Sequence, residues 1–221
     1  IAKRLRKVLE KKGVEFYMQS AVKKIVDGCV SFERKGKVLS VEADKVLMAV
    51  GRKPNVEGYG LENTSIQYDQ RGIVVDDNML TNVNGVYAIG DVNARMMLAH
   101  AATMQGLHVV NHIIGESDVI DLNIMPAAIF TNPEAACVGK TEEQLKAEGV
   151  EVEVRKKNYR TNGRALAMAE AEGMIKLVAD ANSGAILCCH AYGSHRADIV
   201  QEISALMCRK TTLKQLHEMV H

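Results

Sequence analysis

The chain has 221 residues, of which 47% are hydrophobic and 25% charged, enough for one large or two ordinary folded units with their own cores. Its 28 lysines and arginines nearly balance 27 aspartates and glutamates, and the net charge of +1 creates no overall field that attracts nucleic acid or an anionic membrane. The apolar runs are too short for a membrane span, and the first residues lack the apolar core of a signal peptide. We therefore expect no nucleic-acid partner and no membrane partner.

The cysteines indicate a reducing compartment. There are five of them, an odd number, and none has CxxC or metal-ligand spacing, which predicts reduced thiols, a cytoplasmic protein and no metal site. Cys188 and Cys189 are adjacent within the apolar run 186–192. Packing as small hydrophobic side chains is favoured there over redox chemistry.

The first fifty residues begin with a helical pattern. Residues 1–12 carry apolar side chains at helical spacing, and Gly13 stands where a C-terminal cap is expected. A chain that begins inside a helix, without an initiator methionine, leads us to expect further sequence upstream. Short strand candidates follow, with turn signals at residues 27–28 and 35–36.

Further along, strands alternate with one long helix. The nearly continuous apolar run 45–50 predicts a strand buried on both faces, and the breaker cluster 51–55 marks a domain boundary. Short strands are predicted in 72–77 and 85–91. A helix is predicted from Leu98 to a stop at Gly115.

The last hundred residues have the pattern of an antiparallel α+β unit. Thr141 and Gln144 are spaced as a capping box at the start of a short helix. The strand candidates are 151–159, 173–180 and 185–192, and a helix follows at 197–210. Consecutive strands joined by short hairpin turns, with a helix late in the order, predict an α+β unit built on an antiparallel sheet.

Asp91 is the first candidate for a binding residue. A strand that ends in Gly90-Asp91 and is soon followed by a helix places the acid at the carboxyl edge of a sheet, where open α/β folds bind ligands. The carboxylate can accept hydrogen bonds from sugar or polyol hydroxyls, and Gly90 permits close approach to the backbone. The helix start near Leu98 offers N–H groups to negative charge. The alternative is an aspartate that caps its own backbone in a turn.

A series of motifs adds to this pattern. They are VLMAVGRKPN at 46–55, RGIVVDDNMLTNVNGVYAIGDV at 71–92, MLAHAATMQG at 97–106, FTNPEAACVGKTEEQL at 130–145 and RALAMAEAEGMIKLVAD at 164–180. In these motifs and their order the chain resembles the pyridine nucleotide-disulfide oxidoreductases, a family of flavoenzymes. Within the family it is most similar to the lipoamide dehydrogenase branch, and less similar to glutathione and mercuric reductases.

The resemblance implies a fold of the class α/β plus α+β. Partial Rossmann-like domains for FAD and NAD would be followed by an antiparallel-sheet dimerisation domain. Residues 1–50 would be the C-terminal part of the NAD-binding domain, residues 51–122 the C-terminal part of the FAD-binding domain, and residues 123–221 the dimerisation domain. The chain as a whole would correspond to the C-terminal half of such an enzyme.

The resemblance also implies cofactor contacts at seven positions. They are Asp91 for the ribityl chain of FAD, Met97, Leu98, Ala99 and His100 beside the flavin ring, and Gly51 and Val22 near the nicotinamide nucleotide of NAD. For His100 we favour a structural histidine whose backbone, rather than its imidazole, meets the cofactor. For Val22 the local sequence supports ordinary core packing at least as well.

Several parts of the family pattern are absent from the sequence. There is no GxGxxG fingerprint between a strand and a helix, and no CxxxxC segment for a redox-active disulfide. The family's catalytic histidine precedes a proline, whereas this sequence ends in LHEMVH. We therefore assign no catalytic role to His217, Glu218 or His221, and none of the 221 residues is a catalytic candidate.

In the intact enzyme the resemblance implies FAD-dependent oxidation of protein-bound dihydrolipoamide with NAD. The enzyme would be a homodimer that serves lipoyl domains of 2-oxo acid dehydrogenase or glycine cleavage complexes, and the chain alone would be inactive. One alternative is a related disulfide reductase, specific for glutathione or mercuric ion, or a transhydrogenase. Another is a dimerisation module without a cofactor. The helix at 197–210 would either join a dimer interface or pack on its own sheet.

Overall fold

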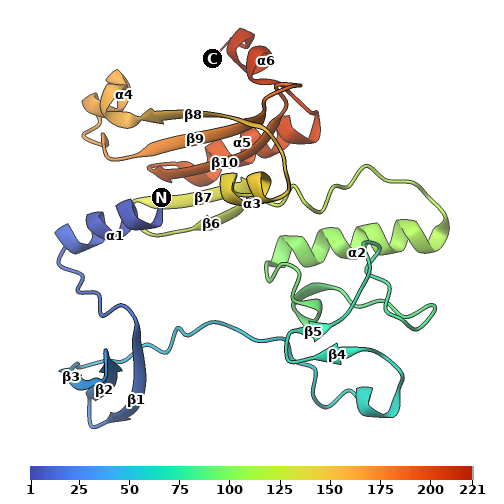
Figure 1. Cartoon of the computed structure of the whole chain (residues 1–221), viewed down its shortest axis with the longest axis horizontal. Helices are drawn as coiled ribbons and strands as arrows, with labels where there is room; N and C mark the ends of the chain where they lie inside the picture. Colours follow the sequence, from blue (N-terminus) through green and yellow to red (C-terminus); the bar gives the residue numbers. More distant parts are fainter. Residues whose placement is uncertain (221) are drawn as a thin grey trace. The chain divides into compact units, whose positions relative to one another are not determined.

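The computed structural model describes residues 1–220 and divides into two compact units, Ala2–Arg52 and the chain from Lys53 onward (Figure 1). Every strand pairing among the described residues is antiparallel. In the same part of the chain, none of the helices combines the length and apolar character that crossing a bilayer requires.

The first unit consists of one helix and a three-stranded meander. Its elements are α1 (Ala2–Lys11), β1 (Ser20–Val26), β2 (Cys29–Arg34) and β3 (Lys37–Glu42), and the strands lie in the order β1-β2-β3. Both hairpins turn through two residues with positive φ: 48° and 77° at Asp27 and Gly28, 52° and 74° at Lys35 and Gly36. That conformation matches the twist of paired strands, and the predicted helix and turns are confirmed.

The strand predicted at 45–50 is wrong. These residues join no strand, and the side chains of Leu47 and Val50 are 89% and 85% exposed. A strand buried on both faces needs partner strands and covering layers. Within residues 1–220 no strand pairs with this segment. The apolar run therefore lies outside the sheets, without the partner strands and covering layers that a buried strand requires.

The second unit begins with short elements around one long helix. They are η1 (Leu61–Asn63), β4 (Tyr68–Asp69), β5 (Gly72–Ile73), η2 (Gly90–Asn93) and α2 (Ala99–Ile114). The helix is confirmed, and Gly115 ends it in a left-handed conformation at φ 75°. The strand predicted at 85–91 is wrong, since only Tyr87 forms a bridge, to Leu80, before Gly90 turns the chain into η2.

A five-stranded antiparallel sheet forms the rest of the second unit. Its strands are β6 (Ala127–Ile129), β7 (Glu134–Gly139), β8 (Val152–Asn158), β9 (Met174–Asp180) and β10 (Ile186–Gly193), in the order β6-β7-β10-β9-β8. Between β7 and β8 lies α3 (Glu142–Ala147), and between β8 and β9 lie η3 (Tyr159–Thr161) and α4 (Gly163–Ala167). Two helices follow β10, α5 (Arg196–Cys208) and α6 (Leu213–Glu218). The predicted capping box is confirmed, because Thr141 and Gln144 exchange both hydrogen bonds at the start of α3.

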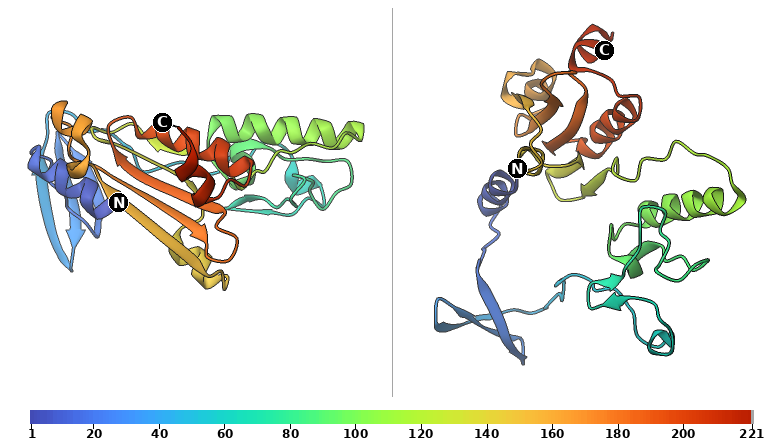
Figure 2. Two further views of the ribbon diagram at one scale, coloured as in Figure 1. Left: turned by 90° about the horizontal axis from the view of Figure 1, so that it is seen from above. Right: turned by 45° about the vertical axis from the view of Figure 1, so that its right-hand side comes forward.

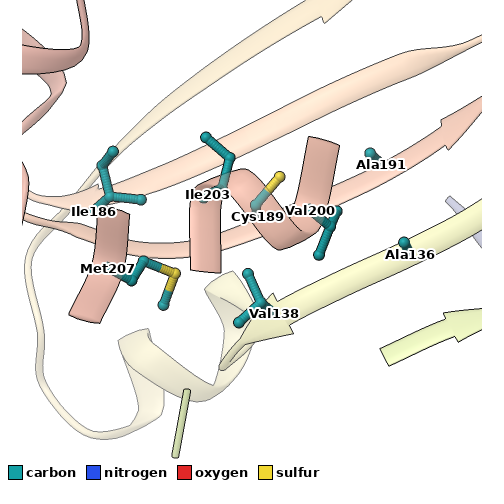
Figure 3. Packing of buried hydrophobic residues seen from close by; sticks show 8 residues of the cluster. All are labelled: Ala136, Val138, Ile186, Cys189, Ala191, Val200, Ile203 and Met207. Atoms are coloured by element: carbon teal, nitrogen blue, oxygen red, sulfur yellow. The ribbon is translucent and has the colours of Figure 1, made fainter. Parts of the chain in front are cut away.

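The main core lies between α5 and this sheet, as Figures 2 and 3 show. It consists of Ala136, Val138, Ile186, Cys189, Ala191, Val200, Ile203 and Met207. Of the two roles considered for this helix, packing on its own sheet is therefore what the structure shows. Cys188 points to the other face and packs with Leu145 and Val178, so the two adjacent cysteines serve two different cores.

The two outer strands of the sheet differ in character. Three consecutive cations, Arg155, Lys156 and Lys157, are exposed along β8. At the opposite edge β6 has only three residues, and Ile129 and the following Phe130 are 60% and 82% exposed.

Candidate functional site

Asp91 lies in the turn η2, which begins at Gly90. Gly90 has φ 75°, and the backbone N–H of Ala94 closes the turn by donating to the carbonyl oxygen of Asp91 over 3.2 Å. The Asp91 side chain is exposed. Among the described residues, none forms a side-chain capping hydrogen bond at the start of η2. The Asp91 carboxylate thus remains available to a ligand.

Two buried amides hold the turn against α2. The side-chain oxygen of Gln105 accepts hydrogen bonds from Gly90 N at 2.7 Å and from Asn93 Nδ2 at 3.0 Å. Asn93 Nδ2 also donates to Ala88 O at 2.9 Å, and Asn93 Oδ1 accepts from Arg95 N at 3.0 Å. Gln105 is only 3% exposed and Asn93 7%, so this network is shielded from water.

Glycines allow the turn to pack closely on both of its sides. A Cβ atom on Gly90 would lie 3.2 Å from Ala102 Cβ of α2, closer than side chains normally pack. On the other side, a Cβ on Gly72 would lie 2.5 Å from the carbonyl oxygen of Val92. The backbone of η2 is therefore fitted between β5 and α2, and no larger residue suits either position.

The start of α2 presents backbone N–H groups without a side-chain cap. Leu98 is the extended N-cap residue, its side chain makes no capping bond, and the first turn contains no acidic residue. Met97 and Leu98 are half-buried, whereas Ala99 is exposed. A 16-residue helix that begins in this way attracts negative charge.

His100 makes a structural contact at the same helix start. Its Nε2 lies 2.8 Å from the carbonyl oxygen of Pro126, one residue before β6. This hydrogen bond engages the imidazole with the backbone that leads into the sheet.

The two positions predicted for NAD lie in the first unit. Gly51 has φ 100°, and a Cβ built on it would meet no atom within 4 Å, so a ligand can approach this backbone closely. Val22 lies on β1 opposite Phe32 and is 59% exposed, so it is not packed in a core. Of the seven predicted residues, Asp91 lies on η2 and the segment from Met97 to His100 leads into α2, and these two elements pack together.

The donors and acceptors of the second unit fit part of a flavin nucleotide. The exposed carboxylate of Asp91 can accept hydrogen bonds from the hydroxyls of a polyol chain. The uncapped start of α2 can stabilise the negative charge of a reduced flavin. The turn that carries Asp91 is tied to α2 by the buried bonds of Gln105 to Gly90 and Asn93.

The cysteines do not form a redox centre in this structure. All five are free thiols. Burial raises the pKa of the Cys188 thiol to about 11 and that of Cys189 to about 12, which suppresses the reactive thiolate. This agrees with the prediction that both pack as small hydrophobic residues.

Gln105 and Asn93 are functional candidates that the sequence analysis missed. The spacing of Ala101, Gln105 and Val109, four residues apart along the predicted helix, was a signal that could have found Gln105. In the structure all three are buried on one stripe of α2. A polar side chain on an apolar stripe needs a buried partner.

Two family models match the chain. Residues 1–106 match the family described as pyridine nucleotide-disulphide oxidoreductase, and residues 125–221 match the dimerisation domain of pyridine nucleotide-disulphide oxidoreductases. The two matches concern one family and follow each other along the sequence.

Curated relatives are similar over the whole chain. A dihydrolipoyl dehydrogenase of Cupriavidus necator is 38% identical over 100% of this chain and 48% of its own length. A dihydrolipoyl dehydrogenase of Bacillus subtilis is 34% identical over 100% of this chain and 48% of its own length. The mitochondrial dihydrolipoyl dehydrogenase of Pisum sativum is 34% identical over 100% of this chain and 46% of its own length. The chain spans about half the length of the curated relatives it matches.

Solved structures agree with this grouping. LpdA from Mycobacterium tuberculosis superimposes with a TM-score of 0.86 at 26% identity, over 98% of this chain and 48% of that one. RclA from Escherichia coli, an HOCl-induced flavoprotein disulfide reductase, shares the fold at 22% identity and a TM-score of 0.83, over 100% and 52%. The predicted class, α/β plus α+β, is confirmed. With both family models and these relatives in agreement, the chain belongs to the pyridine nucleotide-disulphide oxidoreductase family.

Proposed function

We propose that the chain is the flavin-contacting and dimerising part of a dihydrolipoyl dehydrogenase. The observation that carries this proposal is the identity of 34–38% to dihydrolipoyl dehydrogenases along the entire chain. The reaction would be the oxidation of protein-bound dihydrolipoamide with NAD. Bound FAD would supply the chemistry that carries electrons between a disulfide and NAD. The redox-active disulfide and the catalytic base would come from outside these 221 residues.

The roles proposed for this chain are to bind and orient. Asp91 would accept hydrogen bonds from the ribityl hydroxyls of FAD, and Met97, Leu98, Ala99 and His100 would lie against the flavin. Gly51 and Val22 would line the approach of NAD. The proposed domains are residues 1–50 for NAD, 51–122 for FAD and 123–221 for dimerisation.

The dimerisation domain supports a homodimer as the working form. Lipoyl domains of 2-oxo acid dehydrogenase or glycine cleavage complexes are the proposed protein substrates. Five free thiols support a reducing compartment, and the cytoplasm is the proposed location.

The test begins with the intact mass and the visible spectrum of the protein purified from its source. We expect a flavin absorption band and reduction of NAD by dihydrolipoamide. Replacing Asp91 with alanine should weaken flavin binding, whereas Asp44→Ala, an exposed change in the first unit, should leave it unchanged.

Two other results would redirect the proposal. A flavin band with activity only toward glutathione disulfide or mercuric ion would indicate a related reductase. A mass of about 221 residues without flavin would indicate a dimerisation module.

A further inference from the structure

Gln105 is 3% exposed and lies within α2, beyond the first turn that holds the proposed flavin contacts. Its oxygen nevertheless accepts two hydrogen bonds from η2, one from the backbone N–H of Gly90 and one from the amide of Asn93. Gly90 is the residue immediately before Asp91. The buried bond at 2.7 Å therefore fixes the Ile89–Gly90 peptide, one residue before Asp91.

We propose that Gln105 is a positioning residue that fixes the Asp91 carboxylate relative to the start of α2, so that both meet the same flavin. This inference rests on the proposed function. The residue belongs to α2 itself, so its bonds to Gly90 and Asn93 connect the turn that carries Asp91 to the helix that begins within the segment from Met97 to His100.

The geometry requires an acceptor atom at this position. Gly90 N–H and Asn93 Nδ2 both point to one oxygen, and both residues are buried. Buried donors that lose their acceptor are costly, because water cannot replace it. A residue of the same size without an oxygen would leave the Gly90 N–H unsatisfied and would release the turn.

We call the bonds of Gln105 to Gly90 and Asn93 the clamp, and further contacts hold the same turn. Asn93 is itself held by Ala88 O and Met79 Sδ, at 2.9 and 3.6 Å, and the turn is wedged against Ala102 through Gly90. A site whose geometry is already fixed loses less conformational entropy on binding. Gln105 is thus expected to contribute to flavin affinity without touching the flavin.

The test uses the complete protein, freed of flavin and titrated with FAD by fluorescence. Gln105→Met keeps the size of the side chain and removes the acceptor, and we expect flavin binding to weaken about tenfold. Gln105→Glu retains an acceptor oxygen and should restore affinity to within about threefold of the unaltered protein. Gln70→Met, the same change at an exposed position between β4 and β5, is the matched control and should leave the affinity unchanged.

A double-mutant cycle with Asp91→Ala separates positioning from general stability. If Gln105 acts through Asp91, Gln105→Met should have little further effect on affinity once Asp91 is replaced. Additive effects of the two substitutions would overturn the proposal, and so would unchanged flavin affinity in folded Gln105→Met.

If Gln105→Met does not fold, hydrogen exchange of the Gly90 amide in the unaltered protein provides a second test. In the unaltered protein this amide should exchange equally slowly with and without flavin. Fast exchange in the flavin-free protein would contradict a preformed clamp. Failure of the proposed function is a separate outcome, because it would appear as an unaltered protein that binds no flavin.

Discussion

Glu134, on β7, accepts hydrogen bonds at its Oε2 from the backbone N–H of Arg196 at 2.9 Å and from that of Ala197 at 3.3 Å. The residues lie more than sixty positions apart, and the carboxylate caps the first turn of α5 from a neighbouring strand. The N-cap residue His195 makes no side-chain capping bond of its own. Glu134 therefore supplies the negative charge that the helix start favours.

Replacing Glu134 should destabilise the sheet unit. We expect Glu134→Ala to lower the free energy of unfolding by about 2 kcal/mol, and Glu134→Gln, which keeps an acceptor, by about 1 kcal/mol. Urea unfolding followed by circular dichroism measures both. Glu148→Gln is a control, since its exposed pair with Lys140 contributes little. Equal effects at the two positions would contradict the capping role.

Glu142 should make stability depend on acid pH. Hydrogen bonds from Lys146 and Lys176, at 2.7 and 2.6 Å, lower the pKa of this carboxyl from 4.5 to about 2. The fold thus favours the ionised form, and this contribution to stability is complete above pH 4.5 and is lost as the pH falls toward about 2. In Glu142→Gln the fall in unfolding free energy between these pH values should be smaller. An unchanged pH profile would show that the two lysines contribute nothing there.

The thiols should differ in their reaction with iodoacetamide at mildly alkaline pH. Cys208 is exposed and should be modified first. Cys188 and Cys189 are fully buried, and burial raises their pKa values to about 11 and 12, so they should react only after unfolding. Peptide mass spectrometry after timed quenching measures the order, and a sample in urea supplies the control. Early labelling of the adjacent pair would mean that β10 opens readily.

Two glycines with the same backbone conformation allow steric clash to be separated from backbone strain. Gly139 and Gly149 both have φ 78°, but a Cβ on Gly139 would clash with the carbonyl oxygen of Leu187, whereas the space around Gly149 is open. We expect Gly149→Ala to cost about 1 kcal/mol of stability and Gly139→Ala about 3 kcal/mol or more. Thermal melting of both variants tests the difference, and similar values would show that strand β10 yields to the added methyl group.

Local signals predicted much of the fold. Thr141 and Gln144 form the capping box that their spacing suggests, and Gly115 ends α2. These features depend on residues a few positions apart, which the sequence displays directly. The run 45–50 failed as a strand because pairing depends on neighbours, and composition alone does not supply them.

In the candidate site, too, features set by nearby residues could be predicted, and features set by distant partners could not. Asp91 and the segment starting at Met97 could be found because they belong to motifs. Gln105 and Asn93 act through bonds that span 12 to 15 residues, and nothing in the local sequence states which donors meet. Only the polar residue on the buried stripe of α2 indicated that such a partner exists.

The unequal edges of the five-stranded sheet limit how copies of this protein can join. The positive charges of Arg155, Lys156 and Lys157 disfavour pairing of another strand with β8. The short apolar strand β6 carries no charged side chain. Growth of a fibre by strand addition needs two receptive edges on every molecule. For the five-stranded sheet, with one such edge, we therefore expect strand addition to stop at a pair joined at β6 instead of continuing into a polymer.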